Sequence, residues 1–201
     1  MIKTKLRNQF LRMSNELETC AHGFASKLVA SSAPRVLFFP SSGREGASLL
    51  RAYYISDALK ERGWISACVS PLIKQSARRR IIHCFCPDLL VYQQCRHPLN
   101  NGDITYGIPY VLDTDDADFY LTVPGLVERL EQTSKKAEGV IAGSRFIEAW
   151  HLQRNPNTTV IWTGTPISQN SYPKHSDRQA TGHPILAWAQ AKPLHYHREL
   201  D

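Results

Sequence analysis

The chain has 201 residues, enough for one good hydrophobic core with part of a second, and its 42% hydrophobic and 21% charged residues are ordinary for a globular protein. Its formal net charge of +6 favours anionic ligands. No apolar run is long enough to cross a bilayer and the N-terminus lacks the core of a secretory signal, so we expect a cytoplasmic protein. Five cysteines, spread unevenly, favour a reducing compartment over a disulfide framework.

Residues 1–33 form the first predicted element, an amphipathic helix followed by a loop. Its apolar side chains recur at helical spacing, and basic side chains occupy other positions. The apolar stripe consists of Ile2, Leu6, Phe10, Met13 and Leu17, and the basic residues are Lys3, Lys5, Arg7 and Arg12. The favoured interpretation is that the stripe packs on the domain. The alternative is peripheral contact with the inner face of an anionic membrane.

Strands and helices alternate through residues 34–167, which we predict to be a Rossmann-like α/β domain. Strands are expected at 36–39, 64–69, 88–93, 110–113, 139–142 and 159–162, and helices at 47–62, 75–85, 123–136 and 145–153. Such alternation implies right-handed crossovers and a doubly wound parallel sheet. Gly63 is expected to end the first of these helices. Residues 168–183 are predicted to be a linker, and 184–201 the start of a truncated second domain.

Four aspartates follow the predicted strand at 110–113: Asp113, Asp115, Asp116 and Asp118. In an open α/β sheet, ligands bind at the carboxyl ends of the strands. Asp113 and Asp115 could bind a divalent metal and a sugar diphosphate, as in GT-A glycosyltransferases. Asp115 and Asp116 could instead contact a substrate hydroxyl or act as a general base, and these two are the predicted catalytic residues. Asp118 is expected to cap a helix.

The candidate substrate- or phosphate-binding residues are glycines, serines and one arginine that follow other predicted strands. They are Ser42, Gly43, Arg44, Gly46, Ser144 and Gly164. Glycines before a helix N-terminus would let the backbone approach a phosphate, and an arginine could pair with it. Ser144 is expected to cap the following helix, with a position in the cleft as the alternative.

Metal and nucleic-acid sites are weakly supported elsewhere. The candidate zinc ligands are spaced too tightly for a usual zinc site; they are Cys84, Cys86, Cys95 and His97. No metal and no cofactor are therefore predicted. The run of arginines at 78–80 has no interleaved aromatics, so nucleic acid is not an expected partner.

The order of motifs resembles the N-terminal domain of GT-B-fold glycosyltransferases, most closely those of family 4. Residues 36–46, VLFFPSSGREG, resemble the first strand and glycine loop of that domain, and 56–64, SDALKERGW, its following helix. Three further segments resemble later strand ends of that domain. They are PYVLDTDD at 109–116, AEGVIAGS at 137–144 and VIWTGTP at 160–166. Residues 185–189, ILAWA, are similar to the strand that opens the second domain.

This resemblance implies sugar transfer from a nucleotide-sugar donor to a carbohydrate or lipid-linked acceptor. Most of the donor site, including a Glu-x7-Glu pair, lies in the family's second domain. Glu199 is the one glutamate after the predicted linker, so that pair cannot be placed here. We therefore expect a truncated, hexosyltransferase-like protein that is inactive alone. The alternatives are a non-catalytic binding or interaction module and a metal-dependent GT-A-like transferase.

Overall fold

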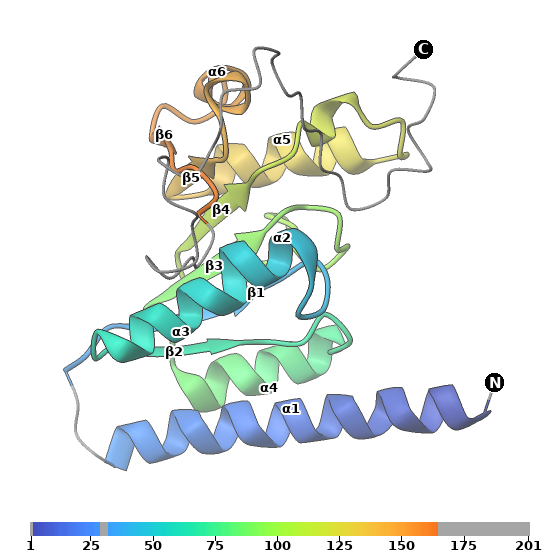
Figure 1. The fold of residues 1–201 in the computed structure, drawn as a ribbon, viewed down its shortest axis with the longest axis vertical. Coiled ribbons are helices and arrows are strands. Elements are labelled where there is room, and N and C mark those ends of the chain that lie inside the picture. The colour runs from blue at the N-terminus through green and yellow to red at the C-terminus, as the bar shows by residue number, and fades with distance from the viewer. Residues whose placement is uncertain (1, 29–31, 165–201) are drawn as a thin grey trace, which may run out of the picture. The chain divides into compact units, whose positions relative to one another are not determined.

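A computed structural model of the protein describes residues 2–28 and 32–164, which fall within one compact unit, Met1–Gly164 (Figure 1). The predicted linker at 168–183 and the predicted start of a second domain at 184–201 lie outside the described residues.

A six-stranded parallel sheet forms the centre of this unit and confirms the predicted doubly wound α/β fold. Its strands are β1 (Arg35–Phe39), β2 (Ile65–Cys68), β3 (Leu89–Gln93), β4 (Tyr110–Thr114), β5 (Gly139–Ala142) and β6 (Thr158–Val160). They lie in the order β2-β1-β3-β4-β5-β6, and every neighbouring pair is parallel. The strand boundaries differ from the predicted ones by at most two residues, and those of β5 coincide.

The helices between the strands also follow the predicted order. They are α2 (Gly46–Ser48), the π-helical turn η1 (Leu49–Tyr53), α3 (Tyr54–Glu61), α4 (Gln75–Phe85), the 3-10 turn η2 (Asp118–Tyr120), α5 (Leu126–Lys136) and α6 (Arg145–Leu152). Gly63 ends α3 as predicted, because its φ of +83° allows its N–H to donate to the Lys60 carbonyl and the Trp64 N–H to the Leu59 carbonyl. Helix α5 begins at Leu126 and not at residue 123, because Gly125 turns the chain with a φ of +71°.

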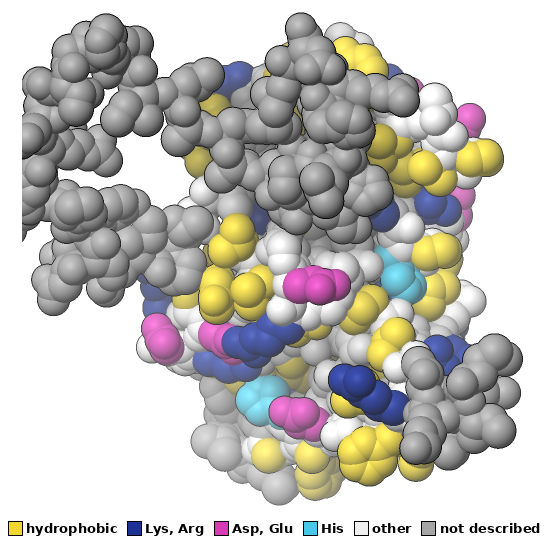
Figure 2. Space-filling view, turned by 45° about the vertical axis from the view of Figure 1, so that its right-hand side comes forward, with side chains coloured by type: hydrophobic (Ala, Val, Ile, Leu, Met, Phe, Trp, Pro, Cys, Tyr) yellow, Lys and Arg dark blue, Asp and Glu magenta, His cyan; other side chains and the backbone are white. Residues whose placement is uncertain are grey.

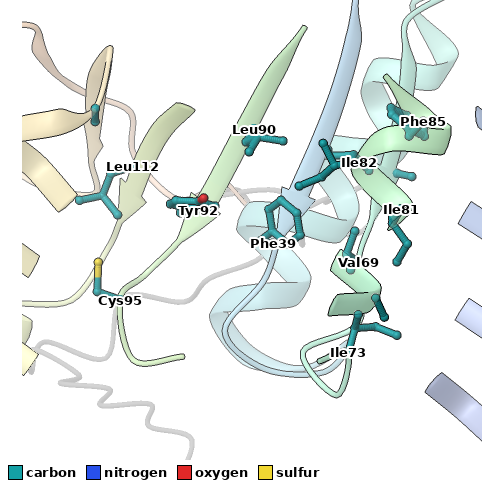
Figure 3. Close-up of a cluster of buried hydrophobic side chains, with 14 of the residues drawn as sticks. Phe39, Val69, Ile73, Ile81, Ile82, Phe85, Leu90, Tyr92, Cys95 and Leu112 are labelled. Carbon is teal, nitrogen blue, oxygen red and sulfur yellow. The ribbon is translucent and has the colours of Figure 1, made fainter. Parts of the chain in front are cut away.

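Alternate side chains of the strands supply two apolar layers, one on each face of the sheet. The larger layer joins β1, β3 and β4 to α4 and α5, and its members include Phe39, Tyr92, Leu112, Ile81 and Ile82 (Figure 3). The smaller layer consists of Val36, Phe38, Val91 and Ala52, with Leu59 of α3 packed against it. The main core therefore lies between the sheet and α4 and α5, and α3 covers the opposite face.

Helix α1 (Ile2–Leu28) runs beside α4 (Figure 1). Phe10, Met13 and Leu17 are 72%, 56% and 68% exposed, whereas Thr19 is 3% exposed. The favoured expectation that this stripe packs on the domain is wrong for these three residues. The surface that receives α1 offers the Ser70 N–H, which donates to Asn15, and Arg80, which pairs with Glu16. These two partners select the polar side of the helix. None of the described helices is both long and apolar enough to cross a membrane.

Candidate functional site

The chain reverses direction across the sheet at the carboxyl ends of β1 and β3. From β1 the chain passes to β2 on one side, and from β3 it continues through β4, β5 and β6 on the other. Ligands of open α/β sheets bind at such a switch point. Polar side chains from the ends of β1, β3 and β4 and from α2 meet there. We call them the switch-point cluster: Ser41, Ser42, Ser48, Gln93, Gln94, Asp115 and Asp116.

Gln93, the last residue of β3, fixes the loop that follows β1. Its side-chain oxygen accepts hydrogen bonds from the Ser41 N–H at 3.1 Å and from the Ser48 hydroxyl at 2.7 Å. It also lies 3.1 Å from the Ser41 hydroxyl, whose single hydrogen it shares with Gln94. The side chain is fully buried, and among the described residues its Nε2 has no hydrogen-bond partner. A buried donor without a partner costs about 1–3 kcal/mol. Nε2 is therefore a buried donor whose desolvation no described residue offsets.

Gln94 joins the loops after β1, β3 and β4. Its Nε2 donates to Asp115 at 2.8 Å and to Asp116 at 3.1 Å, while its Oε1 accepts from the Ser41 hydroxyl at 2.9 Å. Its backbone has a φ of +60°, which a residue other than glycine rarely adopts. Such strained conformations concentrate at functional sites. Sequence reasoning missed both glutamines, although two consecutive amides after an apolar strand were a visible signal.

The four aspartates have different surroundings. Asp113 is buried and forms an ion pair with Arg51 of η1, and none of the cluster's hydrogen bonds described above involves its carboxylate. Asp115 is half-buried, and burial together with the charge of Asp116 raises its pKa above the ordinary value. Asp116 is exposed and accepts from Arg96 at 2.8 Å. The structure therefore brings the two predicted catalytic residues, Asp115 and Asp116, together.

Asp118 is not the helix cap that the sequence predicts. The N-cap of η2 is Ala117, and no side chain makes the capping bond. The buried Asp118 carboxylate instead accepts from Arg96 Nη2 at 2.5 Å. A buried carboxylate needs a counter-charge more than a short 3-10 turn needs a cap, and Arg96 supplies it.

The described residues contain no group of three or more His, Cys, Asp or Glu side chains that could hold a metal ion. The Asp113 carboxylate is already occupied by Arg51. Of the cysteines considered for zinc, Cys95 is buried and Cys86 is exposed. His97 hydrogen-bonds to the Pro71 carbonyl and lies 3.2 Å from Arg78.

The candidate phosphate-binding residues are divided between several places. Ser42 belongs to the cluster, where its hydroxyl donates to Ser48 Oγ at 2.9 Å. Gly43 lies in the same loop, and Gly46, with a φ of +50°, is the first residue of α2. Arg44 does not join the cluster, because it pairs with Asp57 at 2.9 Å. Both side chains line a groove that residues of β2 also border.

The last two candidates follow β5 and β6. Ser144 caps α6 as predicted, accepting a hydrogen bond from the Ile147 N–H at 3.3 Å. Gly164 borders a cavity of about 200 Å³ on the α3 face of the sheet. That cavity is lined mainly by apolar side chains, including Phe38, Val91 and Trp162.

Gly143 determines how closely β5 approaches the acids. A Cβ at this position would lie 2.7 Å from Asp115 Cα and 2.9 Å from its Cβ. We expect Gly143→Ala to displace Asp115 and to lower the free energy of unfolding by about 1–3 kcal/mol. Urea denaturation measures the loss, and NMR chemical shifts of Asp115 report the displacement.

Gly43→Ala is the matched control, because a Cβ there meets nothing within 4 Å. It should change stability by no more than about 0.5 kcal/mol. Equal stability of the two variants would contradict the close packing of Gly143 on Asp115.

The cluster combines hydroxyls, primary amides and carboxylates that can both donate to and accept from a ligand. These groups suit a ligand rich in hydroxyls, and Asp115 is placed to accept a proton. Comparison with known proteins finds no family model that matches the chain and no curated protein significantly similar to it.

Proposed function

We propose that this chain takes part in sugar transfer and that the switch-point cluster binds the hydroxyl-rich acceptor. The observation that carries the proposal is the network through Gln94, which holds Ser41, Asp115 and Asp116 together at the carboxyl edge of the sheet. Carboxylates and amides are the side chains best suited to bind neighbouring hydroxyls of a sugar, because each can contact two polar atoms at once.

In this reaction the acceptor hydroxyl oxygen attacks the anomeric carbon of the donor sugar. A new C–O bond forms there, and the bond to the nucleoside diphosphate breaks with its electron pair moving to the diphosphate. The Asp115 carboxylate takes the proton of the hydroxyl. Its raised pKa brings it closer to the working pH, which strengthens it as a general base. Asp116, held by Arg96, orients the network from outside.

Asp115→Asn is expected to weaken sugar binding by at least about tenfold, because hydrogen bonds to a charged group contribute about 1.5–3 kcal/mol. The chain is titrated with a panel of neutral monosaccharides and disaccharides, followed by NMR chemical shifts. The matched control is Asp103→Asn, since Asp103 is an exposed acid paired with Lys136 at a distance from the cluster.

The absence of binding by the unsubstituted chain, or equal binding by Asp115→Asn, would contradict the proposal. A second assay follows transfer of a labelled sugar from nucleotide-sugar donors. Turnover that disappears in Asp115→Asn supports the role as base. Saccharide binding at the cluster without turnover supports instead the alternative of a non-catalytic binding module.

A further inference from the structure

Helix α1 carries a stripe of large apolar side chains that no described part of the chain covers. Phe10, Met13, Leu17 and Phe24 are 72%, 56%, 68% and 62% exposed. Their spacing places them along one side of the helix. Figure 2 shows hydrophobic side chains along the lower edge of the molecule, at the height of α1 in Figure 1. Four large apolar groups in a row on one helix are more than scattered surface residues.

The other side of α1 contacts the domain, so the stripe cannot turn inward without loss of these contacts. Asn15 Oδ1 accepts from the Ser70 N–H at 2.8 Å, and Glu16 pairs with Arg80 at 2.7 Å. A Cβ at Gly23 would lie 2.6 Å from Phe85 Cα, so the backbones approach closely there. Contacts with α4 and with the loop after β2 therefore fix the rotation of the helix.

The apolar surface extends from α1 onto α4. Leu17, Cys20, Ala21 and Phe24 line an open, mainly apolar depression together with His83 and Cys84. Burial and the neighbouring Cys84 thiol raise the pKa of Cys20 to about 11, so this thiol carries no charge near neutral pH. The surface is therefore wider than one helix stripe and contains little that would resist transfer out of water.

Charge decides between the partners that such a surface fits. The helix has four basic residues, Lys3, Lys5, Arg7 and Arg12, before its first acid. That acid, Glu16, is already paired with Arg80. Only Glu18 remains within residues 2–28, so a second copy of α1 offers little negative charge to complement these basic residues. An anionic lipid surface instead complements both the apolar stripe and the charge.

We propose that α1 lies in the plane of an anionic membrane surface and inserts Phe10, Met13, Leu17 and Phe24 below the headgroups. A 27-residue helix is about 40 Å long, which provides an extended line of contact. Because α1 keeps its contacts with α4, the α/β domain is held at the membrane. This inference does not depend on the proposed sugar transfer.

The test measures co-flotation of the full chain with vesicles of phosphatidylcholine alone or mixed equally with phosphatidylglycerol. We expect binding to the anionic vesicles to be at least about tenfold tighter, and to weaken as salt is added. The double variant Leu17→Gln with Phe24→Gln should reduce that binding by at least about tenfold, because two inserted apolar side chains are lost. Urea denaturation should find its stability unchanged, since both side chains are exposed in the free protein.

Leu11→Gln is the matched control. Leu11 is 43% exposed on the same helix but lies off the stripe, so its substitution should leave vesicle binding unchanged. Absence of binding, equal binding to both kinds of vesicle, or full binding by the double variant would overturn the proposal. So would a lipid-free dimer that the double variant dissociates, because the surface would then belong to a second copy of the chain.

Discussion

Arg51→Met is expected to lower the free energy of unfolding by about 3–5 kcal/mol near neutral pH, because it leaves a buried carboxylate without its counter-charge. The side chains of Arg51 and Asp113 are each 5% exposed. Arg51 Nε donates to Asp113 Oδ1 at 2.9 Å, and Nη1 donates to the Ile161 carbonyl and the Thr163 hydroxyl at 3.0 Å. One arginine thus joins η1, the end of β4 and the segment after β6. Urea denaturation measures the loss.

The loss should be larger at pH 8 than at pH 5. Burial raises the pKa of Asp113 to about 6, from an ordinary value of 3.8, although Arg51 opposes this shift. Because the folded state holds the proton more tightly, the contribution of Asp113 to stability falls as the pH rises from about 4 through 6. Removal of Arg51 raises this pKa further, so the variant continues to lose stability above pH 6.

The matched control is the double variant Arg51→Met with Asp113→Leu, which removes both charges and should recover most of the stability. Equal destabilisation by Arg51→Met at both pH values would mean that packing, and not the stranded carboxylate, dominates the loss. A double variant no more stable than Arg51→Met would also contradict the argument.

His151 of α6 should make the fold sensitive to acid. It is fully buried, its Nδ1 lies 2.9 Å from the Ser134 hydroxyl, and among the described residues its Nε2 has no partner. Burial, and then the nearby charge of Arg154, lower its pKa from 6.5 to about 4. The unfolded chain therefore binds the proton more readily, so the histidine's contribution to stability is present above pH 6.5 and is lost as the pH falls to about 4. A shift of this size corresponds to about 3 kcal/mol.

His151→Gln removes this titration. The free energy of unfolding of the unsubstituted chain minus that of the variant should therefore change by about 3 kcal/mol between pH 7 and pH 4. The difference isolates His151 from Asp113, whose contribution changes in the opposite direction over this range. His83→Gln, at an exposed position of α4, is the control and should leave the pH dependence unchanged. A difference that stays constant with pH would show that His151 does not titrate in the folded state.

Local sequence patterns were sufficient for the elements of this fold and for some of their ends. Short apolar runs alternating with helical periodicity predicted six parallel strands, because burial on both faces of a sheet requires continuous apolar residues. Gly63 and Ser144 were identified as helix ends, since their bonds join residues only a few positions apart. The position of Asp115 and Asp116 past β4 followed from the length of one strand.

The partners of these side chains were decided by the tertiary structure, because they lie far apart in the sequence. Gln94 contacts Ser41 and Asp115 across 53 and 21 positions, and Arg51 reaches Asp113 across 62. The sequence predicts a cap at Asp118, but the tertiary structure places Arg96 beside its carboxylate. For α1, periodicity defined the apolar stripe but not its direction, because rotation depends on the surface that receives the helix. Here that surface offers the Ser70 N–H and Arg80 as polar partners, and Phe85 lies close to Gly23. The polar side of α1 is therefore buried and the apolar stripe faces outward.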